Sequence, residues 1–354
     1  MRSQADSQRV SSASGIVMVL MTLVGWSSVP LFLKHFADSI DTWTSNGWRY
    51  GFSALVWAPV LLVGLARNRL PAGLWRAAIV PSALNIGGQV CFTWAFYKID
   101  PGLVTFGLRA QIVFVSIGGY LFFASERKVI RTPGYIIGAL MVISGVLATV
   151  TGGGAVDATH TFGVLLALGA GLMFAGYALA VRHFMHGMHP VVAFAAISQY
   201  TATGMIALML AIGDRSGLGA LDLPGSQFSL LLLSALIGIA LGHVFYYASI
   251  ARLGVAVSSG VIQLQPFVVT AFSAMIFGER LSIRQWIGGL VAIGGAGVML
   301  AMQHHVSRRE RATAAAMADA IEDQIEEEPP LLAEAAEDSE AEAAAADRGG
   351  LPVS

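Results

Sequence analysis

Two arginines lie inside long apolar stretches of this chain, where an ionised side chain costs roughly 2.5–3.5 kcal/mol. Arg49 and Arg109 each follow the start of an apolar run by six or seven residues, a depth of about 9–11 Å in a helix. A guanidinium donates paired hydrogen bonds to a carboxylate or phosphate. The two residues therefore favour an anionic or zwitterionic solute, although each side chain could instead extend along its own stem to the membrane interface.

Uncharged polar groups offer a second chemistry, hydrogen bonding to a solute. Four residues spaced four, three and four apart share one helical face: Ser259, Gln263, Pro266 and Thr270. Pro266 leaves the carbonyl of Ile262 without its helical partner, which predicts a broken turn with a free acceptor. Asn85 and Gln89 lie one turn apart in another apolar run. Hydrogen bonding between packed helices is the alternative for both groups.

Aromatic and histidine side chains form a third group of candidates. His243 is the one histidine inside an apolar run, and histidine titrates near neutral pH. It is therefore the candidate for proton coupling, or a neutral, hydrogen-bonded buried residue. Tyr246 follows it within one turn and Tyr177 lies in another run. Trp26 is interpreted as a wall residue of a cavity, with helix packing as the alternative.

The composition shows which elements must position these residues. The 354 residues are 55% hydrophobic and 12% charged, with a mean hydropathy of +0.68, whereas soluble domains carry about 25% charged residues. Residues 1–304 hold 17 basic and nine acidic side chains, and 13 further acids lie beyond them. Such a chain is an integral membrane protein. The scattered Lys and Arg residues exclude a nucleic-acid binder, and a single cysteine, Cys91, excludes an intramolecular disulfide and a cysteine-based zinc site.

Ten runs approach the roughly 20 apolar residues that a membrane-spanning helix needs. They are 15–33, 43–66, 77–97, 102–124, 133–151, 162–181, 190–212, 228–250, 254–277 and 285–303. With a cytoplasmic N-terminus, thirteen Lys and Arg residues fall on the cytoplasmic side and five on the other. The positive-inside rule therefore predicts that both termini are cytoplasmic. The expected setting is a multi-pass protein of the cell (inner) membrane.

The two halves of the chain repeat each other. The segment from Gly15 to Lys34-His35-Phe36 matches the segment from Gly163 to Arg182-His183-Phe184 at an offset of 148 residues. Glu126-Arg127 matches Glu279-Arg280 at an offset of 153, and glycines seven apart follow each: Gly138 with Gly145, and Gly288 with Gly295. Five spans per half predict an inverted repeat. The glutamates at these span ends are interpreted as caps or as loop pairs with the adjacent arginines.

These residues resemble the EamA repeat of the drug/metabolite transporter superfamily. The strongest stretch runs from Pro266 through Gly278-Glu279-Arg280 to Gly288, and the first half matches through Gly25-Trp26-Ser27, Arg49-Tyr50 and Glu126-Arg127. It departs from the pattern at Val113, which stands where a proline is expected, and at Arg109. The resemblance implies an all-α fold of ten transmembrane helices in two inverted five-helix repeats. It also implies a central cavity and transport, often export, of small solutes.

The predicted organisation is an N-terminal cytoplasmic segment 1–14, a first repeat 15–151, a Gly-rich connector 152–161, a second repeat 162–303 and a disordered acidic tail 304–354. The predicted function is alternating-access transport, in the export direction, of an amino acid, organic acid or similar metabolite. The expected partners are that solute, the lipid bilayer and a coupling proton, with no cofactor, metal or nucleic acid, in a monomer or homodimer. A cationic multidrug exporter is the alternative, disfavoured because no acid lies within a span. A lipid-modifying enzyme would need a catalytic cluster that the spans do not contain.

Overall fold

A computed structural model describes residues 2–152, 157–253 and 255–327, and these residues form helices and turns without a strand. The first half contains α1 (Arg2–Phe36), α2 (Thr42–Ala66), α3 (Leu74–Phe96), α4 (Pro101–Gly107), α5 (Gln111–Phe122), α6 (Arg127–Ile130) and α7 (Pro133–Thr151). The second contains α8 (Ala158–Phe184), α9 (Pro190–Ile212), α10 (Gly225–Ala235), α11 (Gly242–Leu253), α12 (Val255–Ile262), α13 (Gln265–Phe277) and α14 (Ile283–Glu327). Of the described residues, those up to Gln303 form one compact unit, and those from His304 to Glu327 belong to a second.

Nine stretches in the described part of the chain are long and apolar enough to cross a membrane. The remaining predicted span, 77–97, forms α3, a helix of 23 residues. It contains Asn85 and Gln89, and this polarity lowers its hydropathy below that of the other spans. Nine spans are therefore found by length and hydropathy, and α3 has the length for a tenth.

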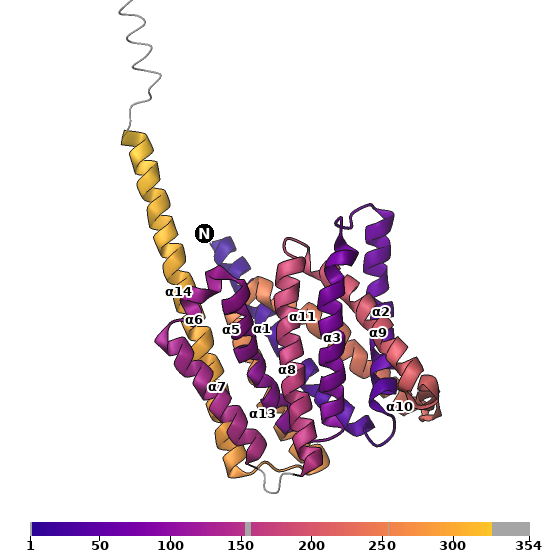
Figure 1. Cartoon of the computed structure of the whole chain (residues 1–354). Helices are drawn as coiled ribbons and strands as arrows, with labels where there is room; N and C mark the ends of the chain where they lie inside the picture. Colours follow the sequence, from indigo (N-terminus) through magenta and orange to yellow (C-terminus); the bar gives the residue numbers. More distant parts are fainter. Residues whose placement is uncertain (1, 153–156, 254, 328–354) are drawn as a thin grey trace, which may run out of the picture. The chain divides into compact units, whose positions relative to one another are not determined.

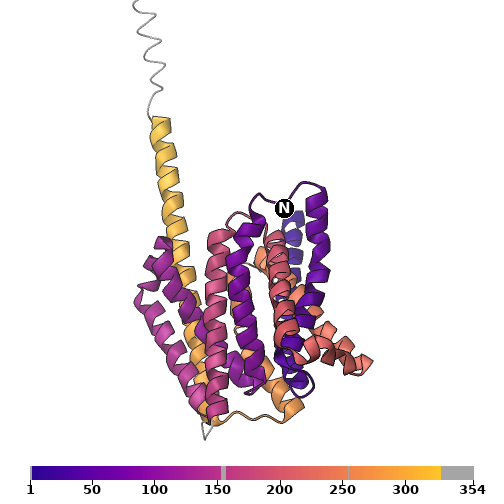
Figure 2. The same cartoon turned by 45° about the vertical axis from the view of Figure 1, so that its right-hand side comes forward.

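The helices pack in a way that follows the internal repeat. In Figures 1 and 2, α3 lies along α8, and the contacts between helices also pair α1 with α11 and α2 with α9. Each of these pairs joins one helix from each half. Since α1 corresponds to α8, the α1–α11 pair is the repeat counterpart of the α8–α3 pair. Each end of the bundle is named after a residue near it. The C-terminus of α1 lies at the Lys34 end, and the C-terminus of α8 lies at the Arg182 end.

Two predicted spans are broken at matching positions. The span 254–277 divides into α12 and α13 at Gln263–Leu264, as Pro266 predicted. The span 102–124 also divides, because a 3₁₀ turn at Leu108–Ala110 separates α4 from α5. An offset of 153 residues maps Ala110 onto Gln263, so the breaks are equivalent in the two repeats. A third irregularity, a π-helical segment at Leu236–Leu241, lies between α10 and α11.

The repeated glycines bring α7 and α14 into backbone contact. A Cβ atom added at Gly145 would overlap the backbone nitrogen of Ala292 and lie 2.5 Å from the carbonyl oxygen of Gly288. A Cβ added at Gly138 would lie 2.7 Å from the carbonyl oxygen of Gly295. Small residues permit this close approach between membrane helices. The glycine pairs of the two repeats therefore face each other across one interface.

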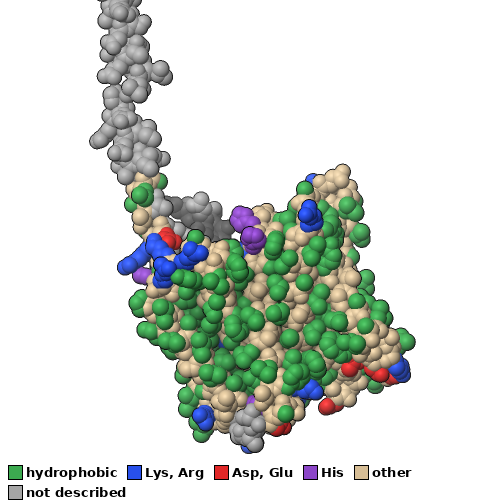
Figure 3. All heavy atoms as spheres, viewed as in Figure 1, with side chains coloured by type: hydrophobic (Ala, Val, Ile, Leu, Met, Phe, Trp, Pro, Cys, Tyr) green, Lys and Arg blue, Asp and Glu red, His purple; other side chains and the backbone are tan. Residues whose placement is uncertain are grey.

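The surface of the bundle has the pattern of a membrane protein. Figure 3 shows hydrophobic side chains over the middle of one face and charged side chains toward its ends. Large apolar side chains such as Leu55, Phe122 and Met275 are more than 70% exposed. In water such a surface would be costly, whereas lipid chains cover it without that cost.

Residues 304–327 are helical, where the sequence analysis expected disorder. They continue α14 with many alanine, arginine and glutamate residues, which have high helix propensity. Their low hydrophobicity therefore does not prevent local helix formation. Residues 328–354, the rest of the predicted acidic tail, lie outside the described residues, as do residues 153–156 of the predicted connector.

Candidate functional site

A cavity of about 550 Å³ lies within the unit of residues 1–303 and is lined by both repeats. From the broken segments of spans 102–124 and 254–277 its lining continues to Glu126, Arg182 and Gln303 at the Arg182 end. Toward the Lys34 end it reaches Val29, Phe92 and Leu108. The lining does not include Lys34, Asp100 or Glu279. The cavity therefore extends from the middle of the bundle to the Arg182 end.

Eight of the ten predicted binding residues line this cavity: Trp26, Asn85, Gln89, Arg109, Tyr177, His243, Tyr246 and Gln263. The other two, Arg49 and Pro266, do not. Lining residues that the sequence analysis missed include Tyr50, Gln111, Tyr135 and Gln265. Gln265 directly precedes Pro266, and the chain break there turns it onto the cavity side, which a continuous helical wheel does not show. The side chain of Ser259 lies outside the described residues.

Arg109 joins the two broken spans across the cavity. Its Nη1 atom donates to Oε1 of Gln263 at 3.0 Å, and its Nη2 atom donates to Oε1 of Gln265 at 3.3 Å. Its Nε atom donates to the carbonyl oxygen of Thr105 at 3.3 Å. A guanidinium has five N–H donors, so these three bonds leave two for a solute. The neutral amide partners leave the positive charge of Arg109 in place.

The repeat interface holds these amides in position. Gln265 donates from Nε2 to the carbonyl oxygen of Trp26 at 2.9 Å, which fixes its Oε1 atom toward Arg109. Asn85 donates from Nδ2 to Oγ1 of Thr201 at 3.0 Å, a contact between the two halves. Asn85 therefore makes the helix–helix hydrogen bond that was the alternative to solute binding, and it also lines the cavity.

Aromatic rings form another part of the wall. The indole of Trp26 lies 5.3 Å from the ring of His243 and 5.0 Å from that of Tyr246, between centroids. Its Nε1 atom donates to the carbonyl oxygen of Gly238 at 3.1 Å, within the π-helical segment. A π-helical segment inside an α-helix is frequently found at functional sites. His243 is also stacked on Phe194 at 4.3 Å, and its Nδ1 atom bonds the carbonyl oxygen of Ile239 at 2.9 Å.

Arg49 has a different place from the one expected for a binding residue. It is 2% exposed, and its Nε atom donates to Oγ of Ser234 at 2.9 Å, which ties α2 to α10. This contact braces the packing of two helices, and it corresponds neither to solute binding in the cavity nor to a side chain that extends to the membrane interface. Its neighbour Tyr50 contributes to the cavity wall instead.

An apolar plug separates the cavity from the Lys34 end. We define it as the buried residues Val29, Leu33, Phe96, Ile99, Leu103 and Leu108, which belong to one packed cluster. Leu33 is 1% exposed and Phe96 is fully buried. A polar solute would lose its hydration among these apolar side chains, so the plug is a barrier to it.

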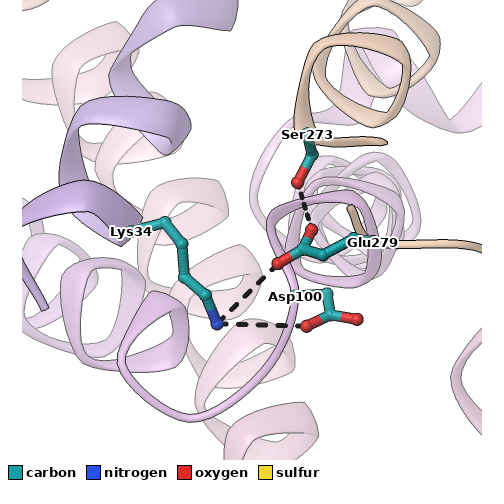
Figure 4. A network of polar contacts seen from close by, with 4 residues as sticks. All are labelled: Lys34, Asp100, Ser273 and Glu279. Carbon is teal, nitrogen blue, oxygen red and sulfur yellow. Dashed lines mark hydrogen bonds and ion pairs between the residues drawn. The ribbon is translucent and has the colours of Figure 1, made fainter. Parts of the chain in front are cut away.

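Ion pairs between the repeats stand at the two ends. At the Arg182 end, Nη1 of Arg182 lies 2.5 Å from Oε1 of Glu126. At the Lys34 end, Nζ of Lys34 lies 3.8 Å from Oε1 of Glu279 and 3.9 Å from Oδ1 of Asp100 (Figure 4). The sequence analysis interpreted each glutamate as a cap or as a loop pair with its adjacent arginine. The ion-pair partners described here are instead Arg182 for Glu126 and Lys34 for Glu279, each from the other half of the chain.

An all-helical bundle of apolar helices, with a polar cavity between two inverted repeats, is the architecture of many secondary transporters. The two repeats match the model of the EamA-like transporter family over residues 13–151 and 161–301. The chain therefore belongs to the EamA-like transporter family, and it is a multi-pass membrane protein. This confirms the resemblance seen in the sequence.

Comparison with solved structures supports the same fold. A protein known by its crystal structure superposes with a TM-score of 0.51 at 17% sequence identity, covering 84% of this chain and 98% of that one. At this identity the similarity shows the fold alone. The search of curated proteins finds no match.

Proposed function

We propose that this protein is a secondary transporter that exports a small anionic or zwitterionic metabolite, such as an amino acid or organic acid, by alternating access. The observation that carries this proposal is Arg109, a charged donor in the cavity wall whose described partners are all neutral. A solute carboxylate would supply the missing negative charge and accept hydrogen bonds from the two remaining N–H groups of Arg109. Glu126, the acid in the lining, is already paired with Arg182.

The arrangement of charges in loops supports an orientation. Arg127, Lys128 and Arg131 lie between α5 and α7 at the Arg182 end, together with Arg182 itself. By the positive-inside rule this end faces the cytoplasm. The cavity then opens inward, which suits the loading step of an exporter in the inner membrane. His243 in the wall is the proposed group for proton coupling.

A cationic amphipathic solute is the second candidate, and the aromatic group of Trp26, Tyr246 and His243 favours it. Aromatic faces attract cations by about 0.5–2 kcal/mol. Such a ligand would lie against these rings and away from Arg109. The two candidates therefore place the solute on different parts of one wall.

A thermal-shift screen in detergent separates the two candidates. A ligand at 100 times its dissociation constant stabilises the folded state by about 2.7 kcal/mol. We expect stabilisation by amino acids or organic acids that is lost in Arg109→Ala and retained in Arg215→Ala, an exposed arginine outside the cavity. Stabilisation by cationic dyes that survives in Arg109→Ala and is lost in Trp26→Ala would overturn the anion proposal in favour of the second candidate.

A further inference from the structure

The two ion pairs at opposite ends of the bundle are related by the inverted repeat. Lys34 and Arg182 occupy matching positions 148 residues apart, and Glu126 and Glu279 occupy matching positions 153 residues apart. In each pair the cation ends the first long helix of one repeat, and the acid follows the broken span of the other. One interaction therefore occurs twice, once at each end of the cavity axis.

The pair at the Lys34 end differs from its counterpart because it contains a second acid. Asp100 shares Lys34 with Glu279, whereas the position equivalent to Asp100 in the second repeat is Leu253. Glu279 is also less exposed, at 13% of its side chain against 22% for Glu126. Two carboxylates and one ammonium group carry a net charge of −1. Glu279 is the least exposed of the three, at 13% of its side chain against 29% for Lys34 and 43% for Asp100. A proton bound to Glu279 would neutralise the group where hydration is poorest.

The contacts of Glu279 leave an atom for that proton. Its Oε2 atom accepts a hydrogen bond from Oγ of Ser273, whereas its buried Oε1 atom has no hydrogen-bond partner among the described residues. Figure 4 shows Lys34 and Asp100 on one side of this carboxyl group and Ser273 on the other. The groups that face it are thus Lys34 from α1, Asp100 at the start of α4 and Ser273 from α13.

We propose that a proton-binding latch holds the two repeats together beyond the apolar plug, at the Lys34 end, and that loss of the proton opens this end. The latch consists of Lys34, Asp100, Ser273 and Glu279. The role of the latch in transport depends on the alternating access proposed above. Its structural basis is independent of the solute, because none of its four residues lines the cavity.

The direction of the pH dependence follows from linkage. Burial raises the pKa of Glu279 to about 7; Ser273 and Lys34 act in the opposite direction, and Asp100 adds to the increase. In an opened latch, water would return this pKa toward its ordinary value. The closed arrangement therefore binds the proton more tightly, is favoured at acidic pH, and loses that advantage as the pH rises to about 7.

Cysteine labelling tests the latch directly. In a Cys91→Ala background, Leu33→Cys places a thiol in the buried plug. A membrane-impermeant thiol reagent is applied to each side of sealed vesicles, and rates are divided by those of Leu218→Cys, an exposed site at the same end, to remove the pH dependence of the thiol itself. From the Lys34 side we expect the ratio to rise roughly tenfold between about pH 6 and about pH 8.

Variants decide which carboxyl group is responsible. Glu279→Gln keeps an amide in place of the protonated acid, so we expect slow labelling at every pH. Asp222→Asn, an exposed acid paired with Arg215 at the same end, is the control and keeps the original profile. A pH profile that persists in Glu279→Gln, or a flat profile in the parent, would overturn the latch. Leu103→Cys, in the same plug, replaces Leu33→Cys if that variant does not fold.

The labelling result is separable from the transport proposal. A latch that responds to pH in a protein that binds and moves none of the tested solutes would sustain the latch and reject the proposed function. Solute flux that is lost in Arg109→Ala, with no labelling response to Glu279→Gln, would sustain the proposed function and reject the latch.

Discussion

Replacing Arg109 by alanine is expected to weaken solute binding, and with it transport, by roughly 100-fold, because removing one partner of a poorly solvated charge pair costs about 2–5 kcal/mol. The variant removes the two N–H donors left for a carboxylate and the cationic charge of the wall. Without a bound solute, it leaves Gln263 and Gln265 facing the cavity, which has room for water to replace the lost hydrogen bonds. We therefore expect the protein to insert and fold. Uptake of labelled solute into reconstituted vesicles measures the loss.

Arg109→Lys gives a sharper result than alanine alone. Lysine retains the charge but presents three donors from one atom, so it cannot repeat the forked contact with Gln263, Gln265 and a carboxylate. We expect affinity between those of the parent and of Arg109→Ala. Arg215→Ala, which removes an exposed arginine outside the cavity, serves as the control. Full flux in Arg109→Ala, with normal insertion, would exclude Arg109 from the site.

The inverted repeat explains why part of the site was predictable. Pro266 indicated the break in the span 254–277, and the structure places it at Gln263–Leu264. No proline marks the equivalent break at Leu108–Ala110, where Val113 occupies the matching position. That turn was missed because its signal lies in the other repeat. The offset between the repeats maps the predicted break in the span 254–277 onto this turn. Transferring the position of the break to the first repeat, without requiring a proline there, would have predicted the turn.

The partners of charged residues could not be predicted in the same way. The offsets aligned Lys34 with Arg182 and Glu126 with Glu279, but they did not show that each cation meets the acid of the opposite repeat. That information depends on how α1 packs against α13 and α8 against α5. Likewise, Arg49 and Arg109 have similar predicted depths. The sequence did not show that Arg49 contacts Ser234 of α10, or that Arg109 lies in a 3₁₀ turn and lines the cavity.

The position of the cavity and of the apolar plug matches the distribution of polar groups. The cavity contains the broken spans, the cationic donor and the amides, whereas the plug is apolar and the latch lies beyond it. Opening the Lys34 end requires the plug to separate, which exposes apolar side chains to water and costs free energy. A charge imbalance in the latch at higher pH would offset part of that cost.

Gly145→Ala is expected to destabilise the protein by about 1–3 kcal/mol, and Gly145→Val by more, because added atoms in a tight interface force the backbone apart. The new Cβ atom would overlap the backbone nitrogen of Ala292 and lie 2.5 Å from the carbonyl oxygen of Gly288. Neither atom belongs to a flexible side chain, so α7 and α14 must separate. Thermal unfolding in detergent measures the change.

Gly297→Ala is the matched control, because it makes the same substitution on α14 with no atom within 4 Å of the added Cβ. Alanine has a higher helix propensity than glycine by about 1 kcal/mol, so this variant should be as stable as the parent or more so. If backbone contact holds α7 to α14, Gly145→Ala therefore lowers the melting temperature, whereas Gly297→Ala leaves it unchanged or raises it. Equal stability of Gly145→Ala and Gly297→Ala would show that the helices separate without cost, and the repeated glycines would then need another explanation.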